Sequence, residues 1–257
     1  MKTALIIGIN GNFGHAMAIA LADAGWQIKA LMRDPQKAPD WINRDAIVTG
    51  SAQNKAKVME AAQGVDLIVY AANPQYHRWH QEALQMLEPT AQVAQETGLQ
   101  LLFPGNVYNF TPAEQRIDEH HPMTAPTDKG EIRIAMEARL KQASQKGAQV
   151  IVVRAGDFLG ENMHMSWLDY MLKGKQGHYK LAMPHDECHI HYWTYLPDLC
   201  ANAVNLLDKS TSAFEVWHDP GFALTTQDWT AAFAHHGYSV KTSAFPWWVF
   251  RLIAPFN

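Results

Sequence analysis

The sequence predicts an α/β protein whose core is a doubly wound parallel β-sheet. Short, continuously apolar runs of strand length alternate with segments of helical periodicity through the first two thirds of the chain. Strands that are apolar at successive positions are typical of parallel sheets covered by helices on both faces. A glycine-rich turn joins the first apolar run to the first helical segment. Right-handed crossovers between such strands give a doubly wound arrangement.

Each expected strand is a short apolar run. The strands are expected as TALII at 3–7, QIKALM at 27–32, AIVT at 46–49, DLIVYA at 66–71, LQLLF at 99–103, QVIVVR at 149–154 and FEVW at 214–217. The helices between and after them are expected at 13–24, 55–63, 81–97, 127–140 and 196–207. In the last helix, Pro197 stands at the start and Asp198 in the first turn, so Asp198 is interpreted as structural.

The helix at 127–140 reads TDKGEIRIAMEARL. Asp128 is its expected N-cap, with Glu131 completing a capping box. Ile132, Met136 and Leu140 fall on one face, and the spacing of Arg133 and Glu137 predicts an i,i+4 ion pair on another.

The pattern loosens after Arg154, which indicates a second, smaller region. The nucleotide-binding core is expected over 1–159, continued by 193–220. The segments 160–192 and 221–257 are rich in aromatic residues and histidine and are expected to form a small substrate-side region.

Bulk composition excludes several classes of protein. Apolar residues make up 47% and charged residues 18% of the chain, which indicates a globular protein. The net charge of −4 predicts no nucleic-acid partner. Two cysteines are too few for a disulfide framework, so a cytoplasmic setting is expected. No secretory leader and no membrane-spanning apolar stretch is recognised. The last residues, FPWWVFRLIAPFN, either pack as a terminal helix or belong to a chain that continues beyond Asn257.

The turn after the first strand predicts a dinucleotide site. It reads Gly8-Ile9-Asn10-Gly11-Asn12-Phe13-Gly14. The first glycine permits a tight turn, the second lets backbone N–H groups approach a pyrophosphate, and the third allows close helix packing. The helix N-terminus adds partial positive charge. A glycine turn without a ligand is the alternative, but the strand–turn–helix context favours a nucleotide.

The end of the second strand, LMRDP, favours NADP over NAD. An NAD site usually has an acidic residue here to hold the ribose 2′-hydroxyl, whereas Arg33 suits a 2′-phosphate. Asp34 is one residue later and still able to face the ribose, so NAD remains open. The alternative for Arg33 is a solvated surface charge.

The segments GINGNFG, LMRDP, DLIVYAANP, LLFPGNVY and VRAGDFLG occur in this order. Together they resemble the extended and atypical short-chain dehydrogenase/reductases of the NAD(P)-dependent epimerase type, over roughly residues 1–220. The resemblance implies a Rossmann core. It also implies cofactor contacts, which together with the glycine turn give the expected set Gly8, Asn10, Gly11, Asn12, Phe13, Gly14, Arg33, Ala71, Ala72, Asn73, Gly105, Asn106, Arg133 and Gly156.

The chemistry that the resemblance implies is incomplete in this chain. The family uses a Ser or Thr after the fifth strand and a Tyr-x-x-x-Lys pair on the next helix. Here Pro104 or Gly105 stands at the hydroxyl position, and Asn106 is the nearest polar side chain, able to polarise a carbonyl. Lys129 and Arg133 stand where the Tyr and the Lys belong. The arginine can hold a ribose hydroxyl or phosphate but cannot shuttle protons.

Three side chains remain as candidates for proton transfer. They are Tyr108, as a phenol near the expected nicotinamide, His77, in the loop after the fourth strand, and Lys129, if burial lowers its pKa. Each has a structural alternative: a tyrosine closing the strand end, a surface residue at a helix start and an exposed first-turn lysine, respectively.

The polar cluster HDECHIH at 185–191 has the ligand types of a metal site, but no second ligand pair at zinc-finger spacing accompanies it. His189 and His191 are expected to share one face of a strand, and the segment is interpreted as lining the substrate cleft or a subunit contact rather than as a metal site. The expected function is an NADP(H)-dependent oxidoreductase or epimerase-like enzyme for a small carbonyl or sugar-like substrate. The alternative is a non-catalytic NADP(H) sensor. No membrane partner is expected, and a homodimer is expected only by analogy with the fold.

Overall fold

A computed structural model describes the chain except for residues 112–116, 162, 165, 185–187 and 249–257. The chain forms two compact units. Unit 1 comprises Met1–Ala155 and Leu196–Asp219, and unit 2 comprises Gly156–Tyr195 and Pro220–Asn257. Within the described residues, no helix is long and apolar enough to cross a membrane.

Unit 1 contains a seven-stranded sheet in the order β11-β6-β5-β4-β1-β2-β3, and every neighbouring pair is parallel. This confirms the predicted doubly wound fold class. Its strands are β1 (Thr3–Ile7), β2 (Gln27–Met32), β3 (Ile47–Thr49), β4 (Leu67–Tyr70), β5 (Gln100–Asn106), β6 (Gln149–Ala155) and β11 (Phe214–His218).

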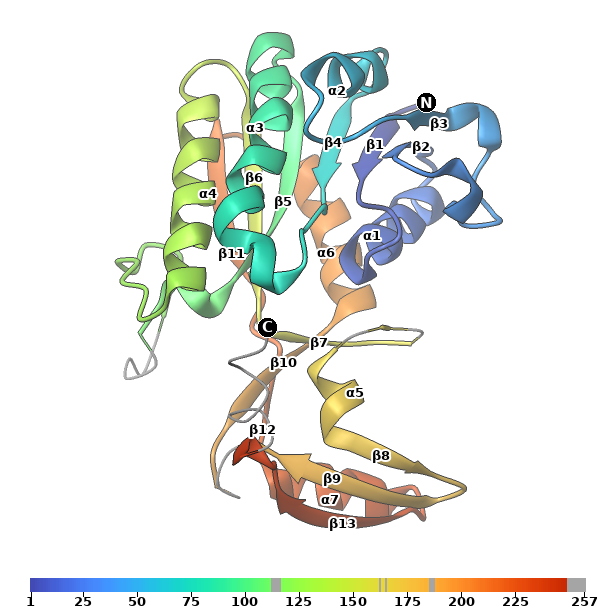
Figure 1. Cartoon of the computed structure of the whole chain (residues 1–257), viewed down its shortest axis with the longest axis vertical. Coiled ribbons are helices and arrows are strands. Elements are labelled where there is room, and N and C mark those ends of the chain that lie inside the picture. The colour runs from blue at the N-terminus through green and yellow to red at the C-terminus, as the bar shows by residue number, and fades with distance from the viewer. Residues whose placement is uncertain (112–116, 162, 165, 185–187, 249–257) are drawn as a thin grey trace. The chain divides into compact units, whose positions relative to one another are not determined.

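Helices cover both faces of this sheet (Figure 1). The helices α2 (Lys55–Ala62), α3 (Trp79–Thr97) and α4 (Asp128–Ser144) pack side by side on one face, and α1 (Asn12–Asp23) packs with α6 (Leu196–Leu207) on the other. The strand β1 shows why both faces are apolar. Leu5 and Ile7 join the core beneath α2–α4, whereas the equally buried Ala4 and Ile6 alternate to the opposite face.

Several element boundaries differ from the prediction. The strand β5 runs three residues beyond Phe103, because Pro104 and Gly105 stay in register with Val153 and Arg154 of β6. A proline and a glycine within a strand hid this extension in the sequence. The helix α4 extends to Ser144, and its N-cap is Thr127 rather than Asp128, since the Thr127 hydroxyl accepts from the backbone N–H of Gly130.

Unit 2 is built from short elements that the sequence pattern did not resolve. They are β7 (Asp157–Leu159), α5 (Trp167–Met171), β8 (Leu172–Lys175), β9 (His178–Met183), β10 (His191–Tyr195), β12 (Phe222–Leu224), α7 (Thr226–His235) and β13 (Ser239–Ala244). They form two three-stranded sheets, β12-β10-β7 and β13-β9-β8. Met171, Leu181 and Trp193 are among the buried side chains of its core.

Candidate functional site

The glycine turn between β1 and α1 has the geometry that its sequence predicted. Gly8 has a φ of +99°, and a Cβ there would lie 2.6 Å from the backbone carbon of Ala71. A Cβ on Gly14 would lie 2.2 Å from the carbonyl oxygen of Gly8. Only glycine fits at these two positions, because the turn, the helix and the end of β4 meet there.

The N-terminus of α1 presents backbone N–H groups without a side-chain cap. Gly11 is the N-cap residue, and a Cβ on it would meet nothing closer than 3.5 Å. Asn10 and Gly11 are exposed and Asn12 is half-buried, whereas the Phe13 side chain is buried in the core. The arrangement suits a phosphate group approaching the helix end, with Phe13 able to contribute only its backbone.

Arg33 and Asp34 follow β2 and differ in their polar contacts. Arg33 is exposed and has no ion-pair partner among the residues that the structure describes. The Asp34 carboxylate instead accepts from the backbone N–H of Gln36 at 3.1 Å, which caps a short turn, and lies 3.7 Å from the ammonium of Lys37.

The residues after β4 and at the end of β5 line the same carboxyl edge of the sheet. Ala71 and Ala72 are half-buried beside Gly8, and Asn73 is exposed. The Asn106 carboxamide oxygen accepts from the backbone N–H of Tyr108 at 3.0 Å, so this side chain caps the turn that follows β5.

Gly105, in β5, leaves room for the side chain of Arg154 on the neighbouring strand β6. A Cβ there would lie 2.5 Å from Cγ of Arg154 on the neighbouring strand.

Arg133, on α4, is buried among aromatic rings. It is 7% exposed, and its guanidinium lies 4.6 Å from the ring centroid of Phe103 and 5.9 Å from that of Trp79. One Nη donates to the carbonyl oxygen of Pro104, while Nε has no acceptor in the described part of the chain. Burial lowers the pKa of Arg133 to about 10, which still leaves it charged at neutral pH.

Lys129 and Tyr76 continue this aromatic stack outward. The Tyr76 ring stacks on Trp79 with centroids 5.0 Å apart, and the Lys129 ammonium lies 4.3 Å from the Tyr76 centroid. Cation–π contacts of this kind contribute about 0.5–1 kcal/mol at exposed sites. We call Lys129, Tyr76, Trp79, Arg133 and Phe103 the cation–aromatic stack. It joins α4, the start of α3 and β5.

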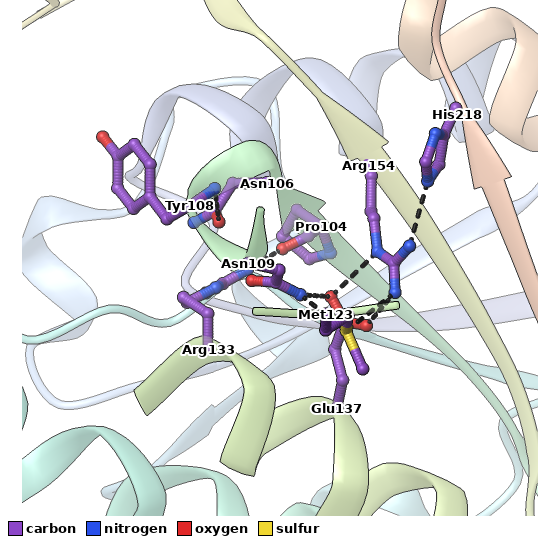
Figure 2. A network of polar contacts seen from close by, with 9 residues as sticks. All are labelled: Pro104, Asn106, Tyr108, Asn109, Met123, Arg133, Glu137, Arg154 and His218. Atoms are coloured by element: carbon purple, nitrogen blue, oxygen red, sulfur yellow. Dashed lines mark hydrogen bonds and ion pairs between the residues drawn. The ribbon is translucent and has the colours of Figure 1, made fainter. Parts of the chain in front are cut away.

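The two other candidates for proton transfer belong to different turns of the chain. His77 is exposed in the turn Tyr76–Arg78 that precedes α3. Tyr108 is half-buried, and its ring points away from the Glu137 carboxylate (Figure 2).

Glu137 does not form the predicted ion pair with Arg133. Instead it joins a buried network with Arg154 of β6, in which Glu137 is 2% and Arg154 4% exposed (Figure 2). Oε2 accepts from Nη2 of Arg154 at 2.6 Å, and Oε1 accepts from Nε at 3.2 Å and from Nδ2 of Asn109 at 2.8 Å. Nη1 of Arg154 lies 3.0 Å from Nε2 of His218. Burial, followed by the Arg154 charge, lowers the pKa of His218.

Sequence reasoning missed this network. The available signals were the charged Arg154 ending an otherwise apolar strand and the Glu137 four residues after Arg133.

In unit 2, His191 pairs with Asp157 rather than sharing a strand face with His189. His189 precedes β10 and lies outside it. Nε2 of His191 lies 2.7 Å from Oδ2 of Asp157. Gly156 immediately precedes this carboxylate, and a Cβ on it would lie 2.3 Å from the carbonyl oxygen of Tyr192. Residues 185–187 of the polar cluster lie outside the described residues, and among those described no group of three or more His, Cys, Asp or Glu side chains is placed to hold a metal.

Comparisons with known proteins agree with the cofactor site. A family model of NAD(P)H-binding proteins matches residues 8–104, which include the glycine turn, Arg33 and the end of β4. None of the curated protein sequences matches this chain.

Solved structures share its fold over most of the chain. The UDP-glucose 4-epimerase of Thermus thermophilus in complex with NAD is 17% identical, with a TM-score of 0.71 over 95% of this chain and 88% of that one. The GalE-like L-threonine dehydrogenase of Cupriavidus necator is 16% identical, with a TM-score of 0.77 over 95% and 86%. The UDP-glucose 4-epimerase of Bifidobacterium longum with NAD⁺ and UDP is 13% identical, with a TM-score of 0.75 over the same shares. At these identities the likeness shows the fold, and the predicted epimerase-type Rossmann fold is confirmed.

Proposed function

We propose that this chain, which carries an NAD(P)H-binding segment in the fold of epimerase-type short-chain dehydrogenase/reductases, is an NADP(H)-dependent oxidoreductase or epimerase for a small carbonyl or sugar-like substrate. The uncapped N-terminus of α1 behind the glycine turn is the observation that carries the proposal. Backbone positions that only glycine fits, next to a helix whose N-cap residue Gly11 provides no side-chain cap, suit a pyrophosphate at this strand end. When bound, the nicotinamide supplies or accepts a hydride.

The preference for NADP(H) rests on the two charged residues after β2. Arg33 is exposed and unpaired within the described part of the chain, so its guanidinium is available to a 2′-phosphate. The Asp34 carboxylate is already engaged by the backbone N–H of Gln36. A carboxylate held in this way is less available to a ribose 2′-hydroxyl.

Binding titrations test the cofactor preference. A hydrogen bond to a charged group contributes about 1.5–3 kcal/mol, so NADPH is expected to bind at least tenfold more tightly than NADH. Arg33→Ala should remove this preference by weakening NADPH binding alone. Lys241→Ala, an exposed cation of unit 2, is the matched control and should change neither affinity. Equal or tighter binding of NADH to the unaltered protein would refute the NADP assignment.

We assign Arg133 to fixing the position of α4 beside the expected cofactor, and not to proton transfer. Its guanidinium stays charged, is packed between rings and already donates to Pro104. Lys129 is likewise engaged with Tyr76. The usual tyrosine chemistry of this helix therefore has no equivalent on α4.

That same stack favours the second candidate function, a non-catalytic NADP(H) sensor. A helix that replaces Tyr and Lys with two cations packed on aromatic rings is suited to binding without turnover. The sensor predicts tight NADPH binding and no NADPH oxidation with a panel of aldehydes, ketones, 2-oxo acids and keto-sugars. If the chain is an enzyme, at least one member of the panel should oxidise NADPH, which is measured as a loss of the absorbance of the reduced nicotinamide.

A further inference from the structure

We propose that one face of the sheet β13-β9-β8 is a docking surface for a lipid bilayer that carries anionic headgroups. The contact is peripheral, so the protein lies on the headgroups and inserts no spanning segment. The surface lies wholly in unit 2 and is independent of the proposed oxidoreductase function. The sequence pattern alone does not predict this partner, because the lysines that form the surface are scattered between positions 173 and 241.

The strand register gathers four lysines on one face of this sheet. Lys173 of β8 stands opposite Lys180 of β9, and Lys180 stands opposite Lys241 of β13. Lys175 is two residues beyond Lys173 along β8 and therefore projects from the same face. All four side chains are exposed. We call these four residues the lysine face.

The sheet is amphipathic, with the lysine face directed away from the core of unit 2. On the opposite face, Leu181 and Met183 are buried in that core. None of the other paired residues on the side of the lysines is acidic, and they are His178, Ala182, Ser239 and Ser243. Nδ1 of His178 lies 2.8 Å from Oγ of Ser239, as expected for neighbours on one face.

The ammonium groups of the lysine face have no carboxylate partner among the residues that the structure describes. That of Lys173 donates to the backbone carbonyl oxygen of Asp169 in α5. The Asp169 carboxylate is engaged elsewhere, because it accepts from the backbone N–H of Ser166 at 2.9 Å. The four positive charges are therefore not neutralised within the described part of unit 2.

Protection of the sheet edges does not account for Lys180. Lysines on edge strands hinder pairing with other chains, which explains Lys173 and Lys241, since β8 and β13 are the edges of this sheet. The strand β9 lies between them and has no free edge. Like charges directly opposite each other destabilise a sheet, so Lys180 lowers stability without a structural need. Such a departure from the usual rules of sheet design is expected where a residue contributes to function.

The composition and layout of the face favour a bilayer over a macromolecular partner. Neighbouring strands are about 4.8 Å apart and alternate residues along a strand about 6.7 Å apart, so the charges form a two-dimensional array instead of a line. Lysine is depleted in protein–protein interfaces, in which aromatic residues and arginine are enriched, and the paired positions of this face hold neither. The same positions provide no ring on which a nucleic-acid base could stack.

The expected affinity is modest and depends on charge. Each lysine near an anionic bilayer contributes about fivefold to the partition constant, so four contribute roughly 600-fold. This corresponds to reversible binding at about millimolar accessible lipid. Charges more than about 10 Å away are largely screened at 0.1 M salt, so the net charge of −4 does not prevent the contact.

Co-sedimentation of the full chain with lipid vesicles tests the proposal. At about 0.1 M salt, the protein should bind vesicles made of equal parts phosphatidylcholine and phosphatidylserine, but not vesicles of phosphatidylcholine alone. Binding should be lost at about 1 M salt, where the Debye length falls to about 3 Å. Lys180→Ala should lower the partition constant about fivefold and Lys180→Glu about 25-fold, because the second change reverses the charge.

The matched control is Lys141→Glu, which makes the same charge change at an exposed lysine of α4 and should alter the partition constant less than twofold. Lys180→Glu relieves repulsion within the row of lysines, so it should unfold at the same or a higher urea concentration than the unaltered protein. A loss of vesicle binding in this variant is then separate from a loss of fold.

Three outcomes would overturn the proposal. The first is no binding to the anionic vesicles at the lower salt concentration, or equal binding to phosphatidylcholine alone. The second is an equal loss in Lys141→Glu, which would assign binding to net charge instead of to this face. The third is binding of polyglutamate that Lys180→Glu abolishes, without any binding to vesicles, which would assign the face to an acidic polypeptide.

Discussion

Replacing Glu137 by leucine should destabilise the protein more than any surface ion-pair change. The carboxylate accepts three hydrogen bonds, two from Arg154 and one from Asn109. Its removal leaves a guanidinium that is 4% exposed with only His218 and the sulfur of Met123 as polar neighbours among the described residues. Breaking a buried pair in this way costs about 3–5 kcal/mol.

That loss is large enough to measure directly. For a chain of this size each kcal/mol lowers Tm by about 2–4 °C, so Glu137→Leu should lower Tm by roughly 6–20 °C. Arg154→Met should do the same, and the double variant should recover much of the loss, because apolar replacement of a whole buried pair is often neutral. Thermal unfolding followed by circular dichroism gives all four corners of the cycle.

A more exposed ion pair, which joins α4 to α3, provides the control. Arg139 of α4 and Glu88 of α3 lie 2.6 Å apart, but the Glu88 side chain is 41% exposed. Such a pair contributes about 0–1 kcal/mol, so Glu88→Leu should lower Tm by only a few degrees. If Glu137→Leu is no more destabilising than Glu88→Leu, the account of a buried, mutually dependent network is wrong.

Three further predictions concern charges elsewhere in the chain. The pKa of His218 is lowered in the folded protein, so the unfolded chain binds a proton at this residue more readily. The free energy of unfolding, measured by urea denaturation, should therefore fall as the pH drops below about 6.5. The fall should be smaller in His218→Gln. Lys180 lies between Lys173 and Lys241 across the sheet β13-β9-β8, so Lys180→Glu should raise the urea midpoint, by up to about 1 kcal/mol in free energy. Burial raises the pKa of the Cys200 thiol to about 12, so in native protein at mildly alkaline pH a disulfide reagent should react with the other, exposed cysteine and reach Cys200 only after unfolding.

The sheet and the glycine turn were predictable because both are local in sequence. Every strand of unit 1 contains a short apolar run, and the glycines at positions 8 and 14 stand within one strand–turn–helix segment. The placement of Arg33 after β2 follows from the same local order. These features need only periodicity and spacing, which a single sequence contains.

The side-chain networks were not predictable in this way. Glu137 had two candidate partners, Arg133 four residues away and Arg154 seventeen residues away, and only the packing of α4 against β6 decides between them. Helical spacing favoured the nearer one, but that guanidinium turns toward Pro104 and the aromatic rings. The pairing of Asp157 with His191 depends similarly on a strand register that no local pattern reveals.

The helices and strands of unit 2 could not be predicted from the sequence, for a physical reason. Its strands have three to six residues, and β13 is exposed at every position but one. Such strands carry little periodic signal, and their burial comes from neighbours distant in sequence.

The division of the chain also has a consequence for its synthesis. The strand β6 is completed at Ala155, but its outer neighbour β11 begins only at Phe214, after the first segment of unit 2. At about 5–20 residues per second, the ribosome needs roughly 3–12 s to make the intervening chain. Throughout that interval Val150 and Val152 belong to an apolar sheet edge with unsatisfied backbone groups, which is the kind of surface that recruits chaperones or pairs with other nascent chains.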